Sequence, residues 1–467
     1  MSGFSARERW LLIAMMAPSG FALIASGMLS VALPAIQREY RVPVELLAWV
    51  VAAPFVPRVP LEPIYGRLAD MLGKRRLYLI GLTIFTLGCA LMIPAPTFTW
   101  LVAAAALQGI GMASFSIGMA VIVEEFPKER RGRALGFWNA ANPFGLMAGP
   151  IIGGIITEWL GWRSNFLLIT VACLASLYVG MRFIPSGFQS RNATPFDSLG
   201  AVALMVGVGS TLLAATTGSL IPFGSTLDLI LWIIAGCAFA VLIWNARSKP
   251  DPFIGSDIFR NRHFIGPTLA VNLRMFAHDG ARFVLVLYLA NVLHQSPSMV
   301  GWVMFLYGLP LFIGVIFGGY LADHWATRVS GNMGTIGQAA GLLWMSMVST
   351  STDIIAFAPG MIAAGFFGGA CLVPFSKEAV AALGIERAGL ASGLYNMLRF
   401  AGSAAATPLL GLLLARGFEN LGGSNTAPEP YQLAFQVLAV VAGLGAIAVM
   451  LIPAPAHGEL AAGAVHD

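Results

Sequence analysis

Charged residues are scarce in this chain. Lys, Arg, Asp and Glu make up 10% of its 467 residues, whereas hydrophobic residues make up 57%. An ordinary soluble domain has about 25% charged residues, and these cover its surface. A chain with so little charge needs a lipid surrounding, so the composition excludes a soluble globular protein and predicts one that lies in a bilayer.

Cysteines and metal-binding patterns are scarce as well. The four cysteines lie within apolar runs, which indicates small hydrophobic side chains rather than disulfides or metal ligands. The chain has no nucleophile elbow, phosphate-binding glycine loop or soluble catalytic domain. The sequence therefore disfavours an enzyme and predicts no cofactor and no metal. The net charge of +5 is not taken as a sign of a nucleic-acid partner.

Long apolar runs are plentiful. They extend over about 20 residues rather than alternating over about 10, which favours transmembrane helices over a β-barrel. We predict an all-α membrane protein with 14 transmembrane helices joined by short connections. The predicted spans are residues 10–35, 45–66, 77–96, 99–124, 134–158, 164–184, 198–218, 226–246, 264–292, 298–320, 332–350, 354–376, 388–414 and 432–453.

Lys and Arg are distributed unevenly between the two sides that these spans define. With the N-terminus inside, 19 of the 27 fall in cytoplasmic segments, and four fall on the opposite side (Arg38, Arg41, Arg163 and Arg416). Because positive residues accumulate in cytoplasmic loops, the pattern predicts cytoplasmic N- and C-termini. We expect a multi-pass protein of the cell (inner) membrane.

The chain also contains an internal repeat. Residues 66–70 (Gly-Arg-Leu-Ala-Asp) recur as residues 319–323 (Gly-Tyr-Leu-Ala-Asp). The pattern Glu-Arg-x-Gly-x-Ala-x-Gly-x-x-Asn occurs at 129–139 and again at 386–396. The two offsets, 253 and 257 residues, are nearly equal. They indicate two copies of one six-helix unit in the same orientation.

The repeat defines the expected domains. Residues 1–190 form an N-terminal six-helix bundle, and residues 256–455 form a C-terminal one. An inserted pair of helices, spans 7 and 8, occupies residues 191–255. Residues 456–467 are a cytoplasmic tail.

Two motifs carry a family resemblance. Residues 66–76 (Gly-Arg-Leu-Ala-Asp-Met-Leu-Gly-Lys-Arg-Arg) resemble the loop signature of the major facilitator superfamily. Residues 145–154 (Gly-Leu-Met-Ala-Gly-Pro-Ile-Ile-Gly-Gly) resemble its antiporter motif, and residues 252–264 and 387–396 are similar to segments of the fourteen-span drug:proton antiporter family. The resemblance implies the major facilitator fold and alternating access, with the proton gradient as the energy source.

The resemblance also implies a gate. Asp70 is expected to act as a latch that pairs, in one conformation, with cations or a helix N-terminus of the facing bundle, and its repeat Asp323 supports this role. Glycines are expected to permit a tight turn after span 2 and close, bendable packing of span 5. The alternatives are a solvated charged loop and generic small-residue packing. The gate and motif residues are Gly66, Asp70, Gly73, Arg75, Asp323, Gly145, Gly149, Pro150 and Gly154.

The chain departs from this family at two positions. Relatives usually carry an Asp in span 1, where this sequence has Ala25, and an Arg in span 4, where it has Ala105. Both groups are often credited with proton coupling. The family mechanism therefore does not transfer directly.

Charge lies in other spans instead. Span 2 has a proline at every third position from Pro54 to Pro63, which predicts a kinked or locally unwound helix. Broken helices commonly line the substrate path of transporters. Arg58 and Glu62 in this span lie one turn apart and can neutralise each other.

Span 9 carries Arg274, His278, Asp279 and Arg282. Charges at bilayer depth are unfavourable unless they are paired or hydrated, so they should point inward. One interpretation is a structural ion pair in each span, with Asp279 paired to Arg274 or Arg282. The other makes Asp279 or Glu62 the carboxylate that carries the proton, beside a coupling arginine. We favour Asp279 because it lies about midway along its span.

Polar and aromatic residues on the inward spans are the candidates for substrate contact. Trp138 and Asn139 occupy positions equivalent in the repeat to those of Tyr395 and Asn396, which indicates a central site shared by both halves. Each candidate has helix packing as its alternative role. The candidates are Gln108, Trp138, Asn139, Tyr395, Asn396 and Arg399.

The leading hypothesis is a monomeric secondary transporter that exports a hydrophobic or amphipathic small molecule by proton antiport. Its partners are the substrate, protons and the lipid bilayer. The main alternative is an exporter or uniporter of one endogenous metabolite or lipid without the usual proton coupling, which Ala25 and Ala105 favour. A membrane enzyme or sensor is disfavoured, because the connections leave no room for a catalytic or output domain.

Overall fold

The computed structural model describes residues 4–185, 197–216, 225–249, 253–255, 257–348, 353–384, 388–421 and 426–453. Some side chains within these ranges, those of Asp70 and Asn139 among them, lie outside the description, and so does the predicted tail. The described residues form helices and contain no strand. The prediction of an all-α protein is confirmed.

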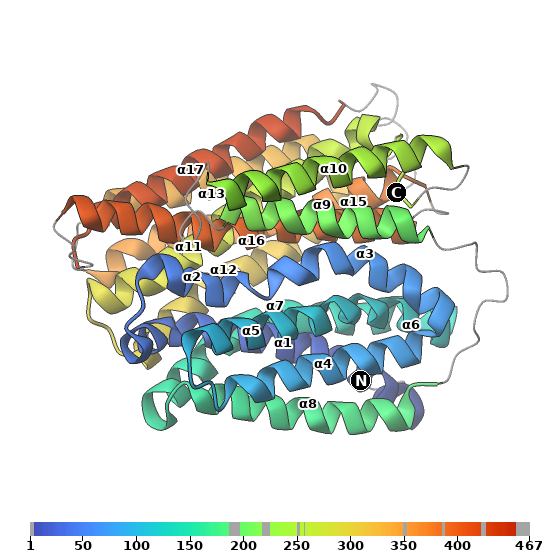
Figure 1. Cartoon of the computed structure of the whole chain (residues 1–467), viewed down its shortest axis with the longest axis horizontal. Coiled ribbons are helices and arrows are strands. Elements are labelled where there is room, and N and C mark those ends of the chain that lie inside the picture. Colours follow the sequence, from blue (N-terminus) through green and yellow to red (C-terminus); the bar gives the residue numbers. More distant parts are fainter. Residues whose placement is uncertain are drawn as a thin grey trace.

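Helices run nearly end to end along the described chain (Figure 1). In chain order they are α1 (Ala6–Tyr40), α2 (Val44–Ala52), α3 (Phe55–Leu72), α4 (Lys74–Met92), α5 (Phe98–Met112), η1 (Ala113–Ser116), α6 (Ile117–Glu125), α7 (Lys128–Leu160), α8 (Arg163–Phe183), α9 (Ser198–Thr216), α10 (Thr226–Ser248), η3 (Ile258–Arg260), α11 (Arg262–Asn291), α12 (Pro297–His324), α13 (Thr327–Val348), η4 (Ile354–Phe357), α14 (Ala358–Ala370), α15 (Leu372–Ala381), α16 (Ala388–Asn420) and α17 (Glu429–Met450).

Eleven helices in the described part of the chain are long and apolar enough to cross a membrane, when a helix with a short break counts as one. Three further helices, α7, α11 and α13, are 33, 30 and 22 residues long but are not among these eleven. Each predicted span overlaps one of these helices, some of which are broken into two or three segments. The apolar runs therefore predicted the helices correctly.

Several helices begin at residues whose side chains cap the free N–H groups of the first turn. Ser5 and Glu8 form a capping box, in which each side chain accepts a hydrogen bond from the backbone N–H of the other. The Ser296 side chain caps α12, where Pro297 takes the first helical position and has no N–H to satisfy. These ends are set by local sequence.

Proline breaks the second span, as predicted. Helix α2 ends at Ala52 and α3 begins at Phe55, with Pro54 between them. The later prolines, Pro60 and Pro63, lie inside α3 and do not end it. The break therefore lies near one end of the proline series rather than along it. It lies about one turn before Arg58.

The two halves lie side by side as separate bundles. In Figure 1 the blue-to-teal helices α1–α8 occupy one side and the yellow-to-red helices α11–α17 the other. Helix α7 packs on α12, and α2 and α3 pack on α16, so these helices form the junction between the halves. The inserted helices α9 and α10 pack on each other, and α9 also contacts α3 and α16.

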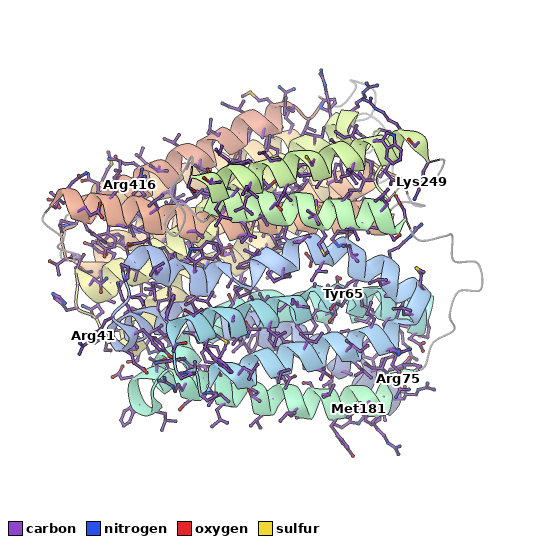
Figure 2. The ribbon with its side chains drawn as sticks, viewed as in Figure 1. Arg41, Tyr65, Arg75, Met181, Lys249 and Arg416 are labelled. Atoms are coloured by element: carbon purple, nitrogen blue, oxygen red, sulfur yellow. The ribbon has the colours of Figure 1, made fainter. Side chains whose placement is uncertain are left out.

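Arginines that were assigned to opposite sides of the membrane lie at opposite ends of the bundle. Figure 2 shows Arg75 at one end, with Lys249, and Arg41 and Arg416 at the other. A chain that crosses the membrane repeatedly places its Lys- and Arg-rich loops at one end and its Lys- and Arg-poor loops at the other. The positions of these four residues agree with that arrangement.

A buried aspartate fastens the inserted pair at the end that carries Lys249. Asp197 accepts hydrogen bonds from Lys249 Nζ at 2.6 Å, Asn245 Nδ2 at 2.5 Å and the Phe253 N–H at 3.0 Å. Burial raises the pKa of this carboxyl, but the hydrogen bonds, with one from the Gly200 N–H, outweigh burial and lower the pKa to about 2. Asp197 thus ties the start of α9 to the end of α10.

Candidate functional site

An ion pair lies inside α3, one turn after the break. Arg58 Nη2 lies 3.4 Å from Glu62 Oε1, and Glu62 is 5% exposed. The Arg58 guanidinium also stacks over the Phe400 ring of α16, 3.8 Å from its centroid. Phe55 stacks on the same ring. The pair therefore faces the other half of the protein rather than lipid.

Arg399 of α16 is the next charge at this junction. Among the described residues no carboxylate lies within ion-pair distance of it, and its Nε is buried without a hydrogen-bond partner. It lies close enough to Arg58, Glu62 and Arg274 for their charges to interact. Arg399 therefore lies near the charged residues of both α3 and α11.

Helix α11 supplies the second carboxylate. Asp279 Oδ1 lies 3.4 Å from Arg282 Nη1. Arg282 also donates through Nη2 to Ser30 Oγ of α1 at 3.1 Å, which joins the two halves. The sequence left open whether Arg274 or Arg282 pairs with Asp279, and the structure selects Arg282.

Arg274 is buried within the second half. Its Nε donates to the Gly368 carbonyl at 2.8 Å, and Nη1 donates to the Met275 sulfur at 2.8 Å. Its Nη2 has no partner among the described groups. Beside it the His278 ring stacks on Tyr307, with Nδ1 3.2 Å from the hydroxyl. Arg274 thus holds α11 against α14 and keeps one N–H free.

The six predicted substrate contacts differ in their burial and hydrogen bonding. Gln108 is buried, and its Nε2 donates to the Cys89 sulfur at 3.0 Å. Trp138 Nε1 and the Tyr395 hydroxyl are buried with no partner among the described groups. Asn396 is half-buried, and the Asn139 side chain lies outside the description. The structure therefore brings Tyr395 and Arg399 together on α16 and separates Gln108 from them.

The gate motif agrees with expectation only in part. Gly73 has φ 93° between α3 and α4, as a tight turn requires. Gly66 instead lies inside α3, and no described atom outside its own helix lies within 4 Å of the position that a Cβ would take. Arg75 Nη2 donates to the Met181 carbonyl at 2.6 Å. The Asp70 side chain lies outside the description.

Asp323 pairs within its own half. Its carboxylate lies 2.9 Å from Lys377 Nζ, and Lys377 also donates to the Ala322 carbonyl. Helices α12 and α15, which carry the pair, pack on each other. The gate role of Asp70 and of its repeat stays a prediction.

The antiporter motif packs α7 against helices of both halves. A Cβ on Gly149 would lie 2.6 Å from the Ile24 carbonyl oxygen of α1, and one on Gly145 would lie 2.6 Å from that of Gly20. A Cβ on Gly154 would lie 2.5 Å from the Pro297 carbonyl oxygen of α12. Pro150 fits against Gly27 and Gly301. These small residues let three backbones approach closely, as predicted.

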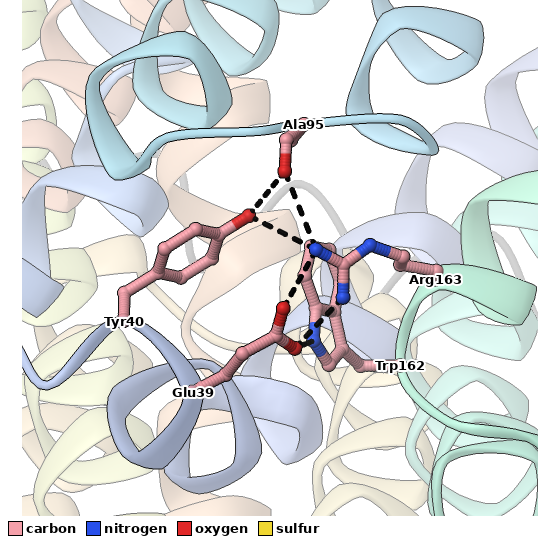
Figure 3. A network of polar contacts seen from close by, with 5 residues as sticks. All are labelled: Glu39, Tyr40, Ala95, Trp162 and Arg163. Atoms are coloured by element: carbon pink, nitrogen blue, oxygen red, sulfur yellow. Dashed lines mark hydrogen bonds and ion pairs between the residues drawn. The ribbon is translucent and has the colours of Figure 1, made fainter.

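A polar network that the sequence did not predict lies at the end of the first half that carries Arg41. Figure 3 shows Arg163 and Glu39 as a two-pronged ion pair, with distances of 2.7 Å from Nη1 to Oε2 and from Nη2 to Oε1. Tyr40 and Trp162 extend the network, and the Ala95 carbonyl accepts from the Tyr40 hydroxyl at 2.7 Å. It ties α1, α8 and the loop after α4 together.

A surface cavity of about 500 Å³ adjoins this network at the junction of α1, α7 and α12. The Glu158 carboxylate accepts a hydrogen bond from the Ser298 N–H at 3.0 Å, which links α7 to α12 beside the cavity. The residues that line the cavity are Ala35, Arg38, Glu39, Thr157, Glu158 and Pro297.

Two related bundles of long apolar helices, with buried charges where they meet, define a multi-pass membrane transporter. The chain belongs to the Major Facilitator Superfamily, whose family model matches residues 17–198 and 268–466.

Relatives and a solved structure agree with this assignment. Multidrug resistance protein Stp of Mycobacterium tuberculosis is 29% identical over 83% of this chain and 72% of that protein. Riboflavin transporter RibZ of Clostridioides difficile is 28% identical over 69% of this chain and 70% of that protein. The human organic anion transporter MFSD10 superposes with a TM-score of 0.64 over 95% of this chain and 99% of its own, at 15% identity, which supports the fold alone.

Proposed function

We propose that this transporter exports a hydrophobic or amphipathic small molecule by alternating access. The supporting observation is the buried cluster of charges between the halves, on α3, α11 and α16, where a substrate would contact both bundles. The similarity to a multidrug resistance protein favours a drug-like substrate. All six substrate candidates from the sequence stay candidates, with Gln108 the weakest because its amide is engaged by Cys89.

The proposed membrane arrangement has 14 crossings, both termini in the cytoplasm, and the cell membrane as location. It counts α7, α11 and α13 as crossings because they are as long as the other eleven and lie among them. Residues 1–190 and 256–455 are the proposed moving bundles, and 191–255 the linker between them. Cysteine accessibility from each side of intact cells would test the side assignment at Arg75 and Arg416.

Proton antiport is the proposed energy coupling, with no bound cofactor. Asp279 and Glu62 are the proposed proton carriers, and each lies 3.4 Å from an arginine of its own helix. Asp279 is 15% exposed and Glu62 is 5% exposed, so Asp279 is the more accessible of the two carboxylates. We therefore retain Asp279 as the first candidate.

Proton flux in proteoliposomes tests this coupling. A pH-sensitive dye would report proton movement in wild type, Asp279→Asn and Glu62→Gln. The substrate added is a permanently charged amphiphile, which cannot carry protons itself. Substrate-evoked proton movement in wild type, with its loss in Asp279→Asn, is the expected result. Glu125→Gln, at an exposed site, is the matched control. Substrate transport with no proton movement in wild type would disprove antiport.

The second candidate is export or uniport of one metabolite without proton coupling. Ala25 and Ala105 favour it, because the two groups often credited with coupling are replaced by side chains that cannot titrate. The similarity to a protein named as a riboflavin transporter also supports this candidate. Riboflavin uptake and efflux in the same proteoliposomes would examine this candidate directly.

A further inference from the structure

Positive charge exceeds negative charge where α3, α11 and α16 meet. Glu62 is paired to Arg58, and Asp279 is paired to Arg282. Arg274 and Arg399 have no carboxylate within ion-pair distance among the described residues. Two cations without a counter-ion inside a membrane protein are strongly unfavourable, so the cluster is suited to a partner of opposite charge.

One face of α16 carries unused hydrogen-bonding groups in a row. Tyr395, Arg399 and Ser403 follow at intervals of four residues and so share a face. The Tyr395 hydroxyl, Arg399 Nε and Ser403 Oγ are all buried without a hydrogen-bond partner in the described structure. Tyr395 and Ser403 are 3% and 1% exposed. Buried polar groups are normally satisfied, so three in one row indicate that a ligand is meant to satisfy them.

Helix α3, which faces α16, also carries buried polar atoms without a partner in the described structure. Arg58 Nε of α3 is also buried without a partner, and so is Glu62 Oε2. Most of these atoms are N–H or O–H donors, and Glu62 Oε2 alone is only an acceptor. A ligand that accepts several hydrogen bonds through a negative group would satisfy more of them than a cationic ligand, which brings donors of its own.

Aromatic rings lie beside the charges. Phe400 follows Arg399 directly, carries the Arg58 guanidinium on one face and stacks with Phe55 at 6.1 Å between ring centroids. Such a stack offers an apolar, flat surface next to two guanidinium groups. It would accommodate the ring system of an amphipathic molecule while its charged group lies on the arginines.

We propose that the substrate of this transporter is an amphipathic organic anion that binds between α3 and α16. Its carboxylate or sulfonate accepts hydrogen bonds from Arg399, with Arg58 and Tyr395 beside it, and its aromatic body lies along Phe400 and Phe55. This proposal rests on the export function proposed above and names the chemical class of the substrate. A cation would meet Glu62, the nearest carboxylate, already paired and flanked by two arginines.

Equilibrium binding to the purified full-length protein in lipid nanodiscs tests this class. The probes are naphthalenesulfonate, naphthalenesulfonamide and trimethyl(naphthyl)ammonium, which share one apolar body and differ in charge. We expect the sulfonate to bind at least about tenfold more tightly than the other two, as one charge-assisted hydrogen bond would provide. Arg399→Gln should remove this preference, and Arg399→Lys should keep most of it.

Arg416→Gln is the matched control, since Arg416 lies on the same helix but is exposed at its end. It should bind all three probes as wild type does. Equal or tighter binding of the cation, or no preference for the sulfonate in wild type, would overturn the proposed substrate class and leave export itself open. Sulfonate binding with no transport in proteoliposomes would instead support the site and count against export. A sulfonate preference that persists in a monodisperse Arg399→Gln protein would overturn the assigned site.

Discussion

Arg282 of α11 donates a hydrogen bond to Ser30 Oγ of α1 at 3.1 Å while its other terminal nitrogen faces Asp279. One side chain thus takes part in a half-buried ion pair of the second half and in a contact with the first half. Any rocking of the halves that separates α1 from α11 must break the bond to Ser30 but can leave the ion pair intact. This bond therefore favours the conformation described.

Replacing Ser30 with Ala should shift the balance between conformations. Loss of a hydrogen bond to a charged donor is worth about 1.5–3 kcal/mol, which corresponds to at least about a tenfold change in population. Distances between spin labels on the α3–α4 turn and the α12–α13 turn would report the populations. Ser26→Ala, one turn away on α1, is the control. Identical distance distributions in Ser30→Ala and Ser26→Ala would contradict the expectation.

Asp197 should make the inserted pair sensitive to strong acid. Its pKa of about 2 lies below its ordinary value, so its charged form stabilises the fold above that ordinary value, and the contribution disappears as the pH falls toward about 2. Asp197→Asn should lower the stability near neutral pH by about 2 kcal/mol. Thermal melting in detergent from neutral pH to about pH 2 would measure both effects, with the gap between variant and wild type closing in acid.

The control for this series is Glu125→Gln, at an exposed position in the first half. It should melt as wild type does at every pH. A constant gap between Asp197→Asn and wild type down to the lowest pH would mean that the carboxylate charge is not what stabilises the α9–α10 junction.

Gly149 should tolerate no side chain. An added Cβ would approach the Ile24 carbonyl oxygen to 2.6 Å, and a backbone atom cannot move away without shifting α1. We expect Gly149→Ala to destabilise the protein by about 1–3 kcal/mol, the usual effect of overpacking. Gly209→Ala in α9, where nothing lies within 4 Å, should be neutral or slightly stabilising. Melting temperatures that fall equally in both variants would refute the role of close packing.

Export of an organic anion should respond to the membrane potential. A potential of about 100 mV is worth about 2.3 kcal/mol per charge, enough to hold an anion at about a 50-fold higher concentration outside. Naphthalenesulfonate efflux from proteoliposomes should therefore accelerate when valinomycin and a K⁺ gradient make the interior negative, even without a pH gradient. Efflux that responds to the pH gradient and ignores the potential would contradict this.

The helices were predictable because a bilayer imposes a length and an apolar composition on every crossing segment. The break before Arg58 and the turn at Gly73 were predictable too, since proline and glycine act through local backbone geometry. The Arg58–Glu62 pair followed from its spacing of one helical turn. In each of these cases the relevant partners lie within a few residues along the chain.

Contacts between distant helices were decided by the tertiary structure alone. Sequence spacing left Arg274 and Arg282 as possible partners of Asp279. Because α11 packs on α14, Arg274 donates to the Gly368 carbonyl, and Arg282 is the arginine that pairs with Asp279. The same holds for Phe400, which lies beside Arg58 because α16 packs on α3. Hydrophobic periodicity says which residues are buried in helices, but the rotation and pairing of helices depend on side chains far apart in the chain. The sequence by itself therefore determined the kind of protein and its charged spans, and the tertiary structure determined which charges are left without a partner.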